Sequence, residues 1–348
     1  MAKRFIVLLV ALLALPFCGH GPRASAQDGQ APIQVNVVLV QLSVAVTDSK
    51  GNYVSGLKPE DFAISEDKIP EKAATFEEGG GPARTVALQP LTDDRPFSGA
   101  TTGATETTGD TSRLSSANVF VLFDTSNYMY RGFVYAQDAI ADFIRSLEDV
   151  SKVALYSYSR DLSRVVTLTP DRSQVLHGLR STVAGDDAAL YNSLLLTVKD
   201  AAPLTGRKVV VVFSNGPDNA SLVPPEDIAE LAQSTGTIIY MISTKEAQSE
   251  PISTAVFQRM STATGGKAYF SKDWQDEKKA FESIRDDLGH LYALSYYPAS
   301  NPNRGWRTIT VKLVGKNLQK YHLRTRTGYR LLLTQTSTPL QESKVEAH

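Results

Sequence analysis

The hydrophobic residues of this chain repeat at different periods in different stretches. Residues 119–123 and 209–213 are unbroken apolar runs, a pattern typical of strands buried on both faces of a parallel sheet. In residues 134–147 apolar positions recur every three or four residues, which predicts an amphipathic helix. Such strands and helices alternate over residues 117–290. We therefore predict a doubly wound α/β domain with a six-stranded, mostly parallel sheet and residues 119–123 as its central strand.

At both ends of the chain the hydrophobic period changes to two. Residues 33–46 alternate, with a change of phase near residues 37–38 that suggests a bulge or bend, and residues 308–313 alternate as well. This pattern predicts short strands in an N-terminal β module, residues 27–78, and in a C-terminal β segment, residues 291–332. We expect these two flanks to form one β-sandwich-like domain, or to pack side by side.

Composition changes this picture in two segments. Residues 79–116 are rich in Gly, Ser, Thr and Pro and have little to bury, so they read as a flexible linker or surface insertion. Residues 333–348 are expected to be a disordered tail. The chain of 348 residues is 42% hydrophobic and 21% charged, which is typical of a globular protein. Its net charge of −1 gives no indication of binding to nucleic acid.

The N-terminus carries the pattern of an export signal. Two basic residues precede the apolar residues 5–17, and an Ala-Ser-Ala cleavage sequence ends at Ala26. The apolar run is too short to span a bilayer, so we predict a cleaved signal peptide, residues 1–26, no membrane insertion afterwards, and a periplasmic or secreted protein. Lipidation of Cys18, the only cysteine, is the alternative, and the bulky Phe17 before it argues against this. Cleavage after Ala26 leaves a chain with no disulfide and no cysteine nucleophile.

Candidate chemistry begins where the central strand ends. In an open α/β sheet, ligands bind outside the carboxyl ends of the strands, and here Asp124, Thr125 and Ser126 follow the apolar run. The strand and these residues resemble the first metal-site loop, D-x-S-x-S, of von Willebrand factor type A domains, with Tyr128 in place of the last serine. The resemblance implies a loop that helps to hold a divalent cation, usually Mg²⁺, whose coordination a partner's carboxylate completes.

Two further loops resemble the rest of that metal site, and both depart from it. Residues 185–192 resemble the family string G-G-T-A-L-Y-D, but Ala188 stands where the resemblance implies a threonine ligand. Residues 213–219 resemble the third loop, with Asn215 in place of its aspartate. Only Asp124 and Ser126 match as metal ligands, and Mg²⁺ needs several well-placed oxygens to replace its waters. We therefore predict that the protein has no tightly bound cofactor, although Mg²⁺ held with help from neighbouring acids stays an alternative.

The flanks carry a second and longer resemblance. The string T-D-x-x-G-x-x-V-x-G-L-x-x-x-D-F-x-x-x-E-D over residues 47–67 is similar to the leader module of exported bacterial proteins related to von Willebrand factor A. Residues 324–329 resemble the R-x-G-Y ending of the same family. Other chemistry finds no support, since there is no glycine-rich nucleotide loop after the first strand and no G-x-S-x-G elbow.

These observations favour an exported, non-enzymatic binding or scaffold protein. It would present the strand-end rim of its von Willebrand A-like domain to a protein partner that the sequence does not identify. The residues that we expect at this rim are Asp124, Ser126, Tyr128, Asp187, Asn215 and Asp218. The alternative is an extracytoplasmic metal-dependent hydrolase or a metal-dependent adhesin, which would use an irregular acidic site at Asp124, Asp186, Asp187 and Asp218.

Overall fold

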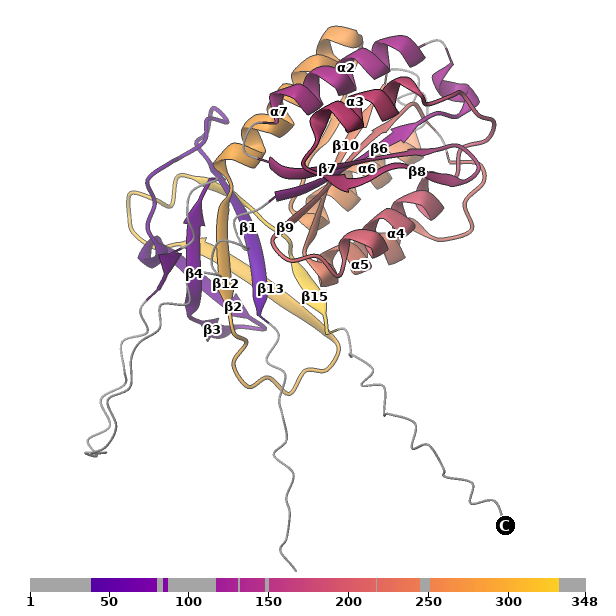
Figure 1. Cartoon of the computed structure of the whole chain (residues 1–348). Helices are drawn as coiled ribbons and strands as arrows, with labels where there is room; N and C mark the ends of the chain where they lie inside the picture. Colours follow the sequence, from indigo (N-terminus) through magenta and orange to yellow (C-terminus); the bar gives the residue numbers. More distant parts are fainter. Residues whose placement is uncertain are drawn as a thin grey trace, which may run out of the picture. The chain divides into compact units, whose positions relative to one another are not determined.

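The centre of the fold is a six-stranded sheet. The computed structural model describes residues 39–79, 84–86, 117–130, 132–147, 150–216, 218–244 and 251–331, all within one unit, Val37–His348 (Figure 1). The strand order is β11-β10-β9-β6-β7-β8. These strands span Ala268–Phe270, Thr237–Ser243, Arg207–Ser214, Ala117–Asp124, Val150–Tyr158 and Leu162–Thr169. Every neighbouring pair is parallel except the β7–β8 hairpin, so the predicted sheet is confirmed.

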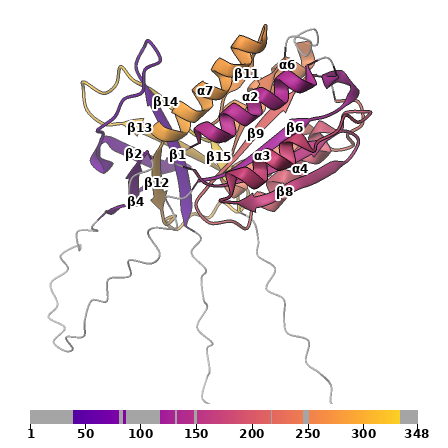
Figure 2. The ribbon, with the colours of Figure 1, turned by 45° about the horizontal axis from the view of Figure 1, so that its top comes forward.

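Helices cover both faces of this sheet, which explains the unbroken apolar runs. All residues of β6 are buried. Val119, Val121 and Phe123 belong to the core under α2, α3 and α7, whereas Phe120 and Leu122 belong to the core under α4, α5 and α6 (Figures 1 and 2). A strand covered on both faces needs apolar side chains on both. Helices α2 to α7 span Phe133–Ser146, Arg172–Arg180, Leu190–Ala201, Pro225–Thr235, Pro251–Thr264 and Trp274–His290.

The two ends of the chain combine into antiparallel sheets outside the α/β domain. One sheet has the order β14-β1-β12-β4-β5 and the other β15-β13-β2-β3. The strands β1 to β5 span Val40–Thr47, Phe62–Glu66, Ile69–Glu71, Ala73–Glu78 and Arg84–Thr85. The strands β12 to β15 span Tyr292–Tyr296, Trp306–Leu313, His322–Arg324 and Gly328–Arg330. N-terminal β1 lies between C-terminal β12 and β14, and β2 pairs with β13, so the predicted joint β structure is confirmed.

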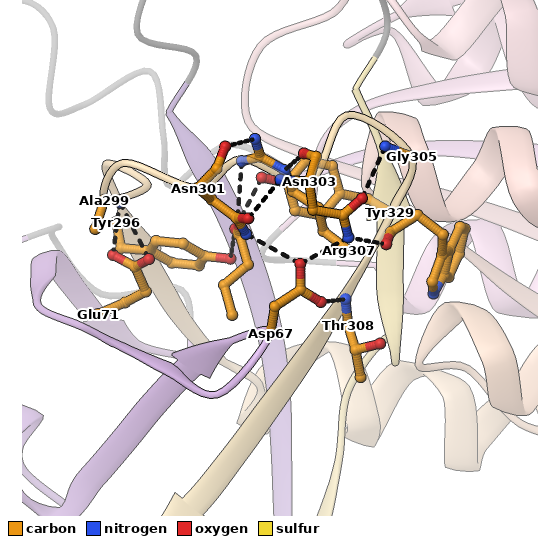
Figure 3. A network of polar contacts seen from close by, with 12 residues as sticks. Asp67, Glu71, Tyr296, Ala299, Asn301, Asn303, Gly305, Arg307, Thr308 and Tyr329 are labelled. Atoms are coloured by element: carbon orange, nitrogen blue, oxygen red, sulfur yellow. Dashed lines mark hydrogen bonds and ion pairs between the residues drawn. The ribbon is translucent and has the colours of Figure 1, made fainter.

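A buried polar network joins the two stretches that carried the longer family resemblance (Figure 3). Glu66 is fully buried and accepts hydrogen bonds from the hydroxyls of Tyr296 (2.9 Å) and Tyr329 (2.8 Å) and from the Arg307 guanidinium (2.8 Å). Asp67 adopts a φ of 50° in the β2–β3 turn, which is unfavourable for a residue with a Cβ. Its carboxylate accepts N–H groups from Asn301, Asn303 and Thr308, and these bonds offset that cost. The Glu66-Asp67 pair of the first family string thus lies close to the Gly328-Tyr329 pair of the second.

The glycine of the R-x-G-Y ending is also explained by packing. A Cβ on Gly328 would lie 2.5 Å from the Arg307 carbonyl oxygen and 2.7 Å from the Trp306 ring. Strands β13 and β15 could not approach each other this closely with any larger residue at position 328. Arg326 in the same string is buried and donates to the carbonyl oxygens of Gln41 (2.9 Å) and Gln233.

A second buried network connects the β sheets to the α/β domain. Asp287 of α7 is completely buried and accepts hydrogen bonds from the hydroxyls of Tyr240 (2.5 Å) and Tyr53 (2.8 Å). It also forms an ion pair with Arg324 of β14. Nearby, Arg207 at the start of β9 donates to the carbonyl oxygens of Leu288 (2.9 Å) and Gly79 (3.2 Å). Buried charges are stable in this setting because several hydrogen bonds replace the lost water.

Several elements differ from the predictions. Helix α3 and strands β3 and β5 were not predicted, and β5 lies inside the segment expected to be a linker. Arg84–Thr85 pairs with β4, which supplies backbone hydrogen bonds that the local composition does not reveal, and residues 80–83 and 87–116 of that segment lie outside the described residues. The predicted signal peptide, Cys18, the bend near residues 37–38 and the C-terminal tail all lie outside the described residues. No helix in the described part of the chain is long and apolar enough to cross a membrane.

Candidate functional site

The rim at the carboxyl ends of the parallel strands centres on Asp124. Strands β6 and β9 are neighbours in parallel register, so the ends of both meet at this edge. Asp124 is 1% exposed, and its Oδ1 accepts the Ser126 N–H at 2.9 Å. Its Oδ2 accepts the Asn215 N–H at 3.1 Å and the Ser214 hydroxyl at 3.3 Å. Asp124 thus accepts hydrogen bonds from the turn that follows β6 and from the end of β9, while the N-cap of α2 is Gly132.

Burial dominates the electrostatics of this carboxylate. Burial raises the pKa of Asp124, and the hydrogen bonds that it accepts from Ser126 and Asn215 oppose that rise. Burial also raises the pKa of Tyr158 well above its ordinary value, and the nearby Asp124 charge adds to this effect. The Tyr158 hydroxyl donates to Ser214 at 3.0 Å, so it supports the side chain that in turn donates to Asp124.

Asn215 connects this loop to two others through its side-chain amide. Its Nδ2 donates to the Tyr128 carbonyl oxygen, and its Oδ1 accepts the Thr244 hydroxyl. Tyr128 belongs to the loop after β6, and Thr244 follows β10. An amide has donors as well as an acceptor, whereas an ionised carboxylate only accepts. An aspartate at this position could not make the bond to Tyr128.

Asn219 makes a second bridge, which sequence analysis missed. Its Nδ2 lies 3.3 Å from the Tyr128 hydroxyl and 3.4 Å from Asp187 Oδ1, and its Oδ1 accepts the Ala188 N–H at 2.8 Å. One side chain of the β9–α5 loop thus contacts both other rim loops. Asn219 ends the stretch that resembles the third loop and begins a glycosylation-type triplet, Asn219-Ala220-Ser221, and neither pattern indicates such contacts.

The other acidic residues of the rim are engaged separately. Asp187 forms an ion pair with Arg160, and Asp218 accepts the N–H groups of Tyr191 and Ser221, each at 2.8 Å. Asp186 is exposed, and only its backbone carbonyl contacts the first loop, at 2.8 Å from the Asn127 N–H. Within the described residues, no group of three or more His, Cys, Asp or Glu side chains is arranged to hold a metal ion.

A cavity of about 340 Å³ opens beside Asn215. It lies next to Tyr128 and Asn215 of the rim and extends between the first turns of α2 and α7. Its lining includes Met129, Tyr135, Phe213 and Trp274. Of these four residues, only Phe213, which is buried in β9, belongs to a predicted strand. Helix α2 packs on α7, so two segments far apart in sequence form its walls.

Comparisons with known proteins identify the class. Residues 118–285 match the von Willebrand factor type A domain family, so the chain carries a domain of this family and the predicted resemblance is confirmed. No curated protein matches the chain.

Three solved structures illustrate the similarity. An aerotolerance-related membrane protein from Bacteroides fragilis is 15% identical, with 50% of this chain and 98% of that chain covered and a TM-score of 0.42. The von Willebrand factor domain of the type V pilus tip protein Mfa5 from Porphyromonas gingivalis is 12% identical, covering 50% and 95%, with a TM-score of 0.43. A von Willebrand factor type A protein from Catenulispora acidiphila is 12% identical, covering 79% and 75%, with a TM-score of 0.43.

The family implies a divalent cation at this rim, and the residues present do not fit one. Ala188 is 1% exposed, belongs to the hydrophobic core and has no ligand atom in its side chain. The Asn215 oxygen already accepts the Thr244 hydroxyl, and both Asp124 oxygens accept N–H groups. Among Asp124, Ser126, Ala188 and Asn215, only Ser126 has a side-chain oxygen that makes no hydrogen bond of good geometry to the described residues. One hydroxyl and one engaged carboxylate do not replace the water shell of Mg²⁺.

Proposed function

We propose that this protein is an exported, non-enzymatic binding protein that presents the rim of its von Willebrand A domain to another protein without tight metal binding. The observation that carries the proposal is the pair of asparagine bridges. Asn215 and Asn219 join the three rim loops by neutral hydrogen bonds at the place where the family uses a cation. A rim organised in this way is shaped for binding before any partner or ion arrives.

The separation of the acidic residues favours this function over the hydrolase alternative. A metal-dependent hydrolase needs several carboxylates around one ion to orient and activate water. Here Asp187 pairs with Arg160, Asp218 accepts backbone N–H groups, and Asp124 is buried. The export signal predicted for residues 1–26 supports a periplasmic or secreted location for the binding protein.

Thermal unfolding with and without millimolar Mg²⁺ tests the metal-independent rim. We expect no change in the unfolding midpoint, because a ligand that does not bind the native state cannot stabilise it. The triple variant Tyr128→Ser, Ala188→Thr, Asn215→Asp restores the family's ligands and should gain a Mg²⁺-dependent rise in midpoint. A clear Mg²⁺-induced rise in the unaltered protein that Asp124→Ala abolishes would overturn this part of the proposal.

Capture of extracytoplasmic proteins by the mature chain tests the binding role. We expect a captured partner to be retained in the presence of a chelator and lost in Tyr128→Ala, because Tyr128 lies at the rim and is 40% exposed. Tyr297→Ala is the matched control, since Tyr297 is 55% exposed and follows β12 in the β sheets. Equal loss in both variants, or loss on chelation, would contradict the proposal.

A further inference from the structure

Exposed large hydrophobic side chains, most of them aromatic, are concentrated in two segments at the rim. Half of the large hydrophobic side chains that are exposed in the described part of the chain lie on the loop after β6, the first turn of α2 and the start of α7. They are Tyr128 (40% exposed), Tyr130 (75%), Val134 (62%), Tyr135 (65%) and Trp274 (59%). Single exposed apolar residues are ordinary, whereas a group of this kind around a cavity marks a binding surface.

Three of these five side chains line the cavity beside Asn215. Tyr128, Tyr135 and Trp274 line its exposed part, and Met129 and Phe213, each 1% exposed, close its inner end. The faces of tyrosine and tryptophan rings attract cations through their quadrupole, and tryptophan does so best. Aromatic walls around a cavity are therefore chemically suited to a cationic side chain.

The charges around the cavity favour the same occupant. Asp273 and Glu277 line it together with one base, Lys272. The Asp273 carboxylate accepts the N–H groups of Gln275 (2.9 Å) and Asp276 (3.0 Å), so it already offsets the positive end of the α7 dipole. The neighbouring loops add Asp186 and Asp218. The described residues of the rim therefore carry more carboxylates than basic groups, which attracts a cation and repels an anion.

We propose that this cavity receives an arginine side chain from a protein partner. The proposal rests on the binding role of the rim and names the chemistry of its ligand. A guanidinium is planar, stacks on aromatic rings and is more weakly hydrated than an ammonium, so arginine fits better than lysine. Among the described residues that line the cavity, Lys272 is the one base against the carboxylates of Asp273 and Glu277, so the charge balance favours a cation over a partner's carboxylate.

The two tryptophans of the chain, Trp274 and Trp306, allow a direct test in the full mature protein. Its indole ¹⁵N–¹H spectrum has two signals, and Trp274→Phe assigns them by removing one. We expect N-acetyl-arginine amide to shift the Trp274 signal in a saturable manner, whereas N-acetyl-glutamate amide leaves it in place. Trp306 lies on β13 and is the internal control.

Variants separate the aromatic and charge contributions. Tyr135→Ala should weaken the apparent affinity for the arginine probe by about two- to five-fold, the factor expected for losing one exposed cation–π contact. Glu277→Gln should also weaken it, and Lys272→Glu should strengthen it several-fold. A Trp274 signal that does not move with arginine, or that moves more with glutamate, would overturn the inference.

The result also distinguishes this inference from the proposed function. If Trp274→Ala leaves capture of a partner unchanged while Tyr128→Ala abolishes it, the rim binds protein and the arginine assignment is wrong. If neither variant affects capture, the binding role of the rim fails together with the inference.

Discussion

At the scale of single residues, the difference between an amide and a carboxylate decides how the rim is held. Asn215 donates to the Tyr128 carbonyl oxygen and accepts from Thr244 at the same time. An aspartate would place a negative charge against that carbonyl oxygen and near Asp124. The family's usual residue is thus incompatible with the observed loop contacts unless a cation is present.

Asn215→Asp should therefore lower the free energy of unfolding by about 1–3 kcal/mol in the absence of divalent cations, the cost of breaking a buried hydrogen bond without a replacement. Urea denaturation measures this. Asn192→Asp is the matched control, because the described contacts of the Asn192 side chain use only its oxygen, which accepts the N–H groups of Leu222 and Val223. We expect the control to change stability by less than about 0.5 kcal/mol; equal losses would contradict the bridging role.

Ser126 gives a second test at this scale. Its buried hydroxyl makes no hydrogen bond of good geometry to the described residues, so removing it should cost little. We expect Ser126→Ala to change the free energy of unfolding by less than about 1 kcal/mol, equally with and without Mg²⁺. A loss that appears only when Mg²⁺ is present would identify the hydroxyl as a metal ligand instead.

At the scale of elements, β9 carries a lysine in an otherwise buried strand. Lys208 donates to the Leu204 carbonyl oxygen at 3.3 Å, and burial, with a smaller contribution from Arg326, lowers its pKa from 10.5 to about 8. Below pH 8 the lysine is charged in both the folded and the unfolded protein, and the folded state bears the cost of burying that charge. Between pH 8 and 10.5 only the unfolded state holds the proton, so this contribution to stability rises with pH.

Lys208→Met should therefore stabilise the protein at pH 7, by up to about 3 kcal/mol from the size of the shift. The advantage over the unaltered chain should shrink as pH rises from 8 towards 10, because the unaltered chain loses its penalty there. Urea denaturation at pH 7 and 9.5 measures both effects. Lys199→Met on the exposed face of α4 is the control and should change little at either pH. An advantage that is constant with pH would show that packing, and not charge, is responsible.

At the scale of the whole molecule, buried polar groups join the β sheets to the α/β domain. Asp287 of α7 contacts Tyr53 near β1, Tyr240 of β10 and Arg324 of β14, and it is fully buried. The hydrogen bonds of Arg207 to Gly79 and Leu288 add a second connection. We therefore expect these described parts to unfold in one cooperative transition.

Asp287→Ala should lower the free energy of unfolding by about 3–5 kcal/mol, because it leaves the Arg324 charge and two tyrosine hydroxyls without their acceptor. Denaturation followed by both far-UV and aromatic signals would show this loss and any separation into two transitions. The adjacent Asp286→Ala is a close control, since Asp286 forms an exposed ion pair with Arg285 that is worth less than about 1 kcal/mol. Similar losses in both variants would refute the connecting role of Asp287.

Much of the architecture was predictable because hydrophobic period is a local property. The apolar run at residues 119–123 has few alternatives to a strand covered on both faces, and β6 is such a strand. The change to period two at both ends predicted short strands, and these form the two outer sheets. Helix α3 and the strands β3 and β5 were not predicted, since elements of two to nine residues show too few periods of their hydrophobic pattern to be told from loops.

The candidate site was predictable only in part. Sequence alone showed that Ala188 and Asn215 depart from the family's metal ligands, and it placed Asp124 at the end of a central strand. It did not show that Asn219 reaches Tyr128 and Asp187, or that Trp274 shares a cavity with Tyr135. These contacts join segments that are tens of residues or more apart in the chain. The strands bring these segments together only when the sheet has formed. The chemistry of the rim therefore depends on the tertiary structure and not on any local pattern of the sequence.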